Sequence, residues 1–225
     1  MQYLYLCAGA LGFMVIFMFQ EKIKNYIAAV MLKGIASAFF VALGVLGSRL
    51  CSDASFAKHV VIGLLLGCIA DVLLNLRFVF EKKGKIIFLV GILVFLSGHI
   101  LYLIALIPKC SHLWLCIGIG AVLTAVTMVL IFRVITAQTA FKIFGVFYIG
   151  AIMIMTCVAI GILIEKPGAS SAVFALGAVS FLISDIVLIL NTFGKESKFS
   201  LRVVNLSLYY VGQLLIALTL QLISR

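Results

Sequence analysis

The chain has 225 residues, of which 65% are hydrophobic and 11% are charged, and its formal net charge is +10 at pH 7. Soluble domains are about a quarter charged and about half apolar, so this composition excludes a soluble globular protein and predicts an integral membrane protein. The basic residues fall mostly between apolar runs, where they orient a chain and meet anionic headgroups, so we expect no nucleic-acid partner.

Eight apolar runs are each long enough to cross a bilayer as a helix, which takes about 20 residues. In chain order the predicted spans are 3–19, 27–47, 59–79, 86–107, 113–132, 141–164, 172–193 and 202–223. The joints between them are short and polar, and the first run has no basic segment or cleavage site that would mark a removed signal. The sequence therefore predicts an all-α, polytopic membrane bundle of eight helices that forms a single domain, residues 1–225.

Lys and Arg are unevenly divided between the two sets of joints. The first, third, fifth and seventh joints hold Lys22, Lys24, Arg77, Lys82, Lys83, Lys85, Arg133, Lys142, Lys195, Lys198 and Arg202. The other set holds Arg49, Lys58, Lys109, Lys166 and Arg225. Cytoplasmic loops carry the excess of basic residues, so the odd joints are predicted to be cytoplasmic. The short loops favour a bacterial inner membrane over the endoplasmic reticulum.

Two aspartates, Asp71 and Asp185, lie 114 positions apart in the third and seventh apolar runs. Each is followed 28 residues later by a polar side chain in the next run, His99 and Gln213 respectively. Membrane folds are often built from repeated halves, so this spacing predicts a parallel duplication of four helices. Its halves would be residues 1–112 and 113–225.

The polar side chains inside the spans lie at similar depths. Asp71 and Asp185 are each ten residues from the basic or acidic edge of their runs, which is about 15 Å at the rise of a helix. A charged group at that depth is costly in lipid and indicates a functional site. Lys33, His99 and Gln213 lie in nearly the same slab, and small or polar residues recur every four positions at Gly63, Gly67, Asp71 and Asn75.

Two carboxyl groups that share one low-dielectric pocket are expected to share one proton. The pair then offers a neutral acid that donates a proton and an anion that stabilises a cation or activates water, as in glycosidases. Asp71 and Asp185 therefore suit a substrate whose cleavage passes through an oxocarbenium ion. Lys33 could belong to this site, or its ammonium group could extend to the membrane edge instead.

Two other functions fit the same residues. A metal-dependent lipid amide or ester hydrolase could bind zinc through His99 and the aspartates, although zinc sites commonly use more than one histidine. A small proton-coupled transporter could use the aspartate pair, although no helix broken by Gly or Pro recurs in both halves. Cys51 and Cys110 lie near one membrane face, and the sequence leaves open whether they form a disulfide.

The order and spacing of several motifs resemble the lysoplasmalogenase family, the YhhN-like membrane proteins. The similarity extends over nearly the whole chain. The matching residues are Lys33, the segment Gly67-Cys-Ile-Ala-Asp71, His99 with Tyr102, Tyr148, Phe181-Leu-Ile-Ser184-Asp185, and Tyr209-Tyr210-Val-Gly-Gln213.

This resemblance implies hydrolysis of the vinyl ether bond of lysoplasmalogens to a fatty aldehyde and glycerophospho-ethanolamine or -choline. The expected partners are a lysophospholipid substrate and the bilayer, with no obligate protein partner, no metal and no cofactor. The expected catalytic residues are Asp71, Asp185 and His99. Residues expected to bind or orient the substrate are Lys33, Asn75, Tyr102, Tyr148, Ser184, Tyr209, Tyr210 and Gln213.

Overall fold

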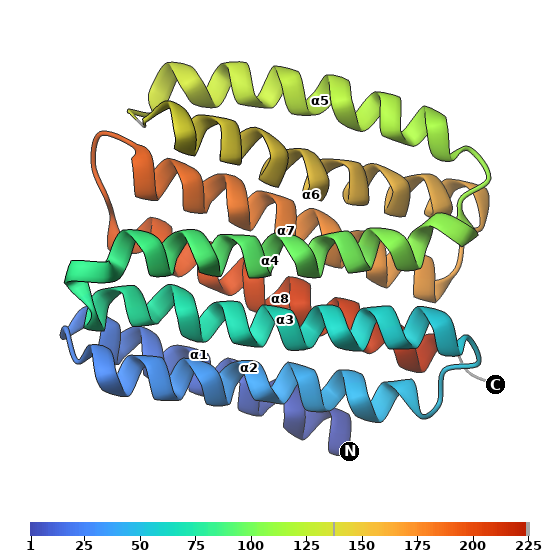
Figure 1. The fold of residues 1–225 in the computed structure, drawn as a ribbon. Coiled ribbons are helices and arrows are strands. Elements are labelled where there is room, and N and C mark those ends of the chain that lie inside the picture. Colours follow the sequence, from blue (N-terminus) through green and yellow to red (C-terminus); the bar gives the residue numbers. More distant parts are fainter. Residues whose placement is uncertain (137, 224–225) are drawn as a thin grey trace. The chain divides into compact units, whose positions relative to one another are not determined.

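A computed structural model of the chain describes residues 1–136 and 138–223. Within this part there are eight long α-helices and two short 3-10 turns, η1 and η2 (Figure 1). All eight helices are long and apolar enough to cross a membrane, so the predicted polytopic helical bundle is confirmed. The elements are α1 (Gln2–Lys22), α2 (Tyr26–Ser48), α3 (Ala54–Val79), η1 (Glu81–Lys83), α4 (Gly84–Leu106), η2 (Ile107–Lys109), α5 (Leu113–Val134), α6 (Thr139–Glu165), α7 (Ala169–Phe193) and α8 (Phe199–Leu222).

The predicted spans match the helices one for one, but some helix ends differ. Helix α3 begins at Ala54, five residues before the predicted start at residue 59. The Asp53 carboxylate accepts a hydrogen bond from the backbone N–H of Phe56 at 2.9 Å, which caps the first turn. Capping by a polar side chain extends a helix into a stretch that hydropathy alone treats as a joint. Arg225, counted above with the non-cytoplasmic basic residues, lies outside the described residues.

The chain divides into two compact units, one made of Met1–Tyr102 with Ala217–Arg225 and the other of Leu103–Ile216. In the first unit α1 packs on α2 and α2 packs on α3; in the second, α5 packs on α6 and α6 on α7 (Figure 1). The boundaries between the units fall within α4 and α8. The single domain and its duplicated halves remain predictions.

Each unit contains a close helix crossing built on two glycines. In the first unit a Cβ on Gly98 of α4 would lie 3.2 Å from the carbonyl oxygen of Gly63 on α3. In the second a Cβ on Gly177 of α7 would lie 3.0 Å from the carbonyl oxygen of Gly212 on α8. Small residues let membrane helices approach backbone to backbone. Both glycines of the second crossing follow those of the first by 114 positions, the spacing of Asp71 and Asp185.

The glycine crossing of the second unit gives a stability prediction. We expect Gly177→Ala to lower the free energy of unfolding by about 1–3 kcal/mol, because the new methyl group meets a backbone oxygen that cannot rotate away. The matched control is Gly118→Ala on α5, where a Cβ would have nothing within 4 Å. Thermal unfolding in detergent measures both variants. Equal melting temperatures for the two would show that the crossing tolerates a side chain.

Candidate active site

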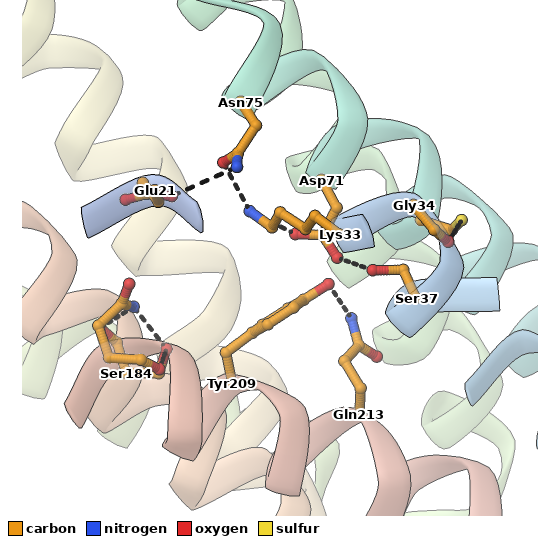
Figure 2. A network of polar contacts seen from close by, with 11 residues as sticks. Glu21, Lys33, Gly34, Ser37, Asp71, Asn75, Ser184, Tyr209 and Gln213 are labelled. Carbon is orange, nitrogen blue, oxygen red and sulfur yellow. Dashed lines mark hydrogen bonds and ion pairs between the residues drawn. The ribbon is translucent and has the colours of Figure 1, made fainter. Parts of the chain in front are cut away.

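The first unit holds a buried ion pair between α2 and α3. The Lys33 Nζ atom lies 3.1 Å from Asp71 Oδ1, and these two residues are 2% and 1% exposed. The hydroxyl of Ser37 donates a hydrogen bond to the other carboxylate oxygen, Oδ2, at 2.6 Å (Figure 2). Lys33 and Ser37 are four residues apart and therefore share one face of α2. Both oxygens of the Asp71 carboxylate thus receive a donor from the neighbouring helix.

A chain of polar contacts extends from this pair to the end of α1. The Lys33 ammonium group donates to Asn75 Oδ1 at 3.3 Å, and the Asn75 amide donates to Glu21 Oε2 at 3.3 Å. Asp71 and Asn75 are one turn apart on α3, so Lys33 reaches both (Figure 2). Glu21 lies in the last turn of α1, where the helix dipole disfavours a carboxylate. Donation by the Asn75 amide offsets this cost.

The alternative in which Lys33 extends to the membrane edge is wrong, because its ammonium group is buried against Asp71 and Asn75. Ser37 and Glu21 are not among the site residues predicted from the sequence. A hydroxyl four residues after a lysine inside an apolar span is the signal that points to Ser37. No periodic pattern of polar residues in the sequence indicates Glu21, because this residue lies at the polar end of its helix.

His99 and Tyr102 lie on α4 in the first unit, and both side chains are buried. The imidazole centroid of His99 is 5.6 Å from the ring of Phe95 and 6.1 Å from the ring of Tyr102. Tyr102 also packs against Gly63, where any side chain would collide with its ring. These described contacts place two aromatic rings of the same helix beside the imidazole of His99.

In the second unit Asp185 of α7 is 2% exposed, and its carboxylate accepts a hydrogen bond from a phenol. The hydroxyl of Tyr148 on α6 donates to Asp185 Oδ2 at 2.8 Å. The structure therefore brings together two residues that the sequence selected separately. Asp71 and Asp185 have different described partners within their own units, an ammonium and a hydroxyl for one and a phenol for the other.

The other selected residues of the second unit join α7 to α8 or line α8. The Asn205 amide donates to the backbone oxygen and to the hydroxyl of Ser184, each at 2.9 Å, and the Ser184 hydroxyl donates to the backbone oxygen of Asn205 at 3.0 Å. These bonds tie the two helices together. On α8 the Gln213 amide donates to the hydroxyl of Tyr209 at 3.3 Å (Figure 2). The rings of Tyr209 and Tyr210 meet edge to face.

Metal coordination needs several suitable side chains gathered in one place. Among the residues that the structure describes, no three His, Cys, Asp or Glu side chains are grouped so that they could hold a metal ion.

The fold and these contacts define a class: a multi-pass membrane protein that keeps ion-paired and hydrogen-bonded side chains inside its spans. The family model of the YhhN family matches residues 28–220. The chain therefore belongs to the YhhN family, the family of lysoplasmalogenases, as the motifs of the sequence indicate. No curated protein and no solved structure matches the chain.

Proposed function

We propose that this protein hydrolyses the vinyl ether bond of lysoplasmalogens, releasing a fatty aldehyde and glycerophospho-ethanolamine or -choline. Its membership of the YhhN family supports the reaction class. The observation that carries the proposal is the buried carboxylate of Asp71, held between Lys33 and Ser37 within a span. A packing role alone would be met more cheaply in lipid by apolar residues.

The proposed reaction begins with proton transfer from a carboxylic acid to the vinyl β-carbon of the substrate. The electrons of the double bond take the proton, and the carbon next to the ether oxygen becomes part of an oxocarbenium ion. Water adds to that carbon and loses a proton to a carboxylate, which gives a hemiacetal. The hemiacetal collapses to the aldehyde, and the glycerol oxygen leaves as a hydroxyl group. No cofactor is required.

The different partners of the two aspartates suggest their roles. We assign Asp71 as the carboxylate that stabilises the cation, because an ammonium group and a hydroxyl donate to its two oxygens. We assign Asp185 as the proton donor, oriented by the hydrogen bond from Tyr148. Lys33 then acts as the counter-ion that holds the Asp71 carboxylate. Its pairing with that carboxylate favours this role over direct binding of the substrate phosphate.

The remaining residues have supporting roles in this proposal. His99 is the third residue assigned to the chemistry, because it is an ionisable group buried in the spans. The side chains assigned to orient water and substrate are Asn75, Tyr102, Ser184, Tyr209, Tyr210 and Gln213. We also propose that the host membrane is a bacterial inner membrane and that the protein acts without an obligate protein partner.

The test is release of fatty aldehyde from an alkenyl lysophospholipid by the purified protein in detergent. We expect aldehyde from the alkenyl substrate and none from the matched alkyl ether, which lacks the double bond that accepts the proton. Activity that survives a chelator supports the acid mechanism, whereas activity abolished by the chelator and restored by zinc would favour a metal-dependent hydrolase. No aldehyde from any alkenyl lysolipid, with proton flux in proteoliposomes, would favour the transporter instead.

A further inference from the structure

We propose that Cys110 and Cys116 are joined by a disulfide bond in the mature protein. Their Sγ atoms lie 3.9 Å apart in the second unit, where the chain passes from η2 into α5. A disulfide needs a sulfur–sulfur distance of about 2.0 Å, so the two atoms must approach by about 1.9 Å. Closing the bond requires rotation about the side-chain bonds of the two cysteines. The sequence leaves open a pairing of Cys110 with Cys51, but the structure places a different thiol beside it.

The backbone between the two cysteines is fixed by the end of α6. The Glu165 carboxylate accepts hydrogen bonds from the backbone N–H groups of Ser111 and His112 at 2.9 and 3.0 Å. Lys166 donates to the backbone oxygen of Lys109 at 3.1 Å. These contacts hold the turn just before α5, so the two thiols stay near each other. A pair held close in advance forms a disulfide at a smaller entropic cost.

The predicted compartment suits this bond. The joint that contains Cys110 belongs to the set that is poor in Lys and Arg and is therefore predicted to face away from the cytoplasm. The bacterial periplasm and the lumen of the endoplasmic reticulum are both oxidising, so the inference holds for either membrane.

The bond would form by thiol–disulfide exchange with a protein disulfide donor of that compartment. The half-exposed thiol of Cys110 loses its proton and attacks one sulfur of the donor's disulfide, which leaves the donor's second sulfur as a thiolate. The thiolate of Cys116 then attacks Cys110 Sγ and displaces the donor's first sulfur. Two thiols of this chain are oxidised to a disulfide, and the donor's disulfide is reduced to two thiols. The two protons that Cys110 and Cys116 lose are taken up by the donor's two thiolates.

A third thiol, that of Cys157, is an alternative partner for Cys116. Cys157 of α6 and Cys116 both line a shallow apolar hollow of about 370 Å³ between α5 and α6. Cys157 lies eight residues before Glu165, which is about 12 Å along the helix from its end. Cys110 instead lies in the turn outside α5, where a soluble donor can reach it. The geometry therefore favours Cys110 over Cys157 as the partner of Cys116.

The test counts and maps thiols in the full chain. The protein is extracted from membranes with an alkylating reagent and no reductant, and the adducts are located by peptide mass spectrometry. The chain has six cysteines. We expect four alkylated thiols and a linked Cys110–Cys116 segment, six alkylated thiols after reduction, and five without reduction in Cys116→Ser. The matched control Cys157→Ser should show three alkylated thiols and keep the link.

Six alkylated thiols in the unreduced wild-type protein would overturn the proposal. A mapped link from Cys110 or Cys116 to Cys51 or Cys157 would overturn it too. Because the wild-type map decides the question by itself, poor folding of a serine variant would leave the result unchanged.

Discussion

Asp71→Asn and Asp185→Asn are each expected to lower the rate of aldehyde release by about 10³-fold or more while the protein remains folded. A positioned acid or base contributes about 10²–10⁴-fold to a rate, and loss of the negative charge beside the cation adds to this. Asparagine keeps the shape of aspartate and can still accept the hydrogen bonds from Ser37 or Tyr148 through its carbonyl oxygen. For Asp185→Asn the loss is therefore chemical, whereas Asp71→Asn also leaves the Lys33 ammonium group without its counter-charge and should lower stability. Aldehyde production at saturating alkenyl lysolipid, per amount of folded protein, measures the loss in both variants.

Asp53→Asn is the matched control for this experiment. Asp53 caps α3 outside the spans, and asparagine caps a helix about as well as aspartate. The control should keep wild-type activity and elute with wild-type protein in size-exclusion chromatography. If either Asp71→Asn or Asp185→Asn kept the wild-type rate, the two-carboxylate mechanism would be wrong, even if aldehyde release itself were established.

Lys33→Met is expected to destabilise the protein more than the double variant Lys33→Met/Asp71→Leu. Removing one partner of a buried ion pair leaves an unpaired charge, at a cost of about 3–5 kcal/mol, whereas replacing both with apolar residues is often neutral. Both residues are almost fully buried, so water cannot replace the lost partner. Thermal unfolding in detergent measures the two variants, and the double variant should regain most of the lost stability without regaining activity.

Lys58→Met is the control for the lysine substitution, because Lys58 is exposed near the start of α3. We expect its effect on unfolding to stay within about 0.5 kcal/mol. Equal melting temperatures for Lys33→Met and the double variant would show that the unpaired carboxylate is not what destabilises the single variant. Recovery of activity in the double variant would remove Asp71 from the mechanism.

The sequence predicts the number and order of the helices because the thickness of the bilayer sets the length of each apolar run. It also places Lys33 and Asp71 near one depth and Asn75 on the same helix face as Asp71, and the structure joins these three by direct contacts. The early start of α3 is missed, because hydropathy does not register the cap formed by Asp53.

Partners of buried polar groups are harder to predict than their depth. The rise per residue gives the depth of a side chain, but the helix that faces it depends on packing between segments far apart in the sequence. The hydrogen bond from Ser37 to Asp71 is therefore not predicted from the sequence, although both side chains are fully or almost fully buried. The hydrogen bonds that join Ser184 of α7 to Asn205 of α8 are likewise not predicted, because depth does not tell which helix a side chain faces.

The glycine crossings of α3 with α4 and of α7 with α8 bear on the biogenesis of this protein. Each crossing joins consecutive spans, connected by only a short turn, so each pair forms a helical hairpin. Helices that meet backbone to backbone associate once both are in the lipid. The hairpin of α3 and α4 can therefore assemble in the membrane during translation, while the later spans are still being synthesised. The second unit closes only after α8 has been inserted.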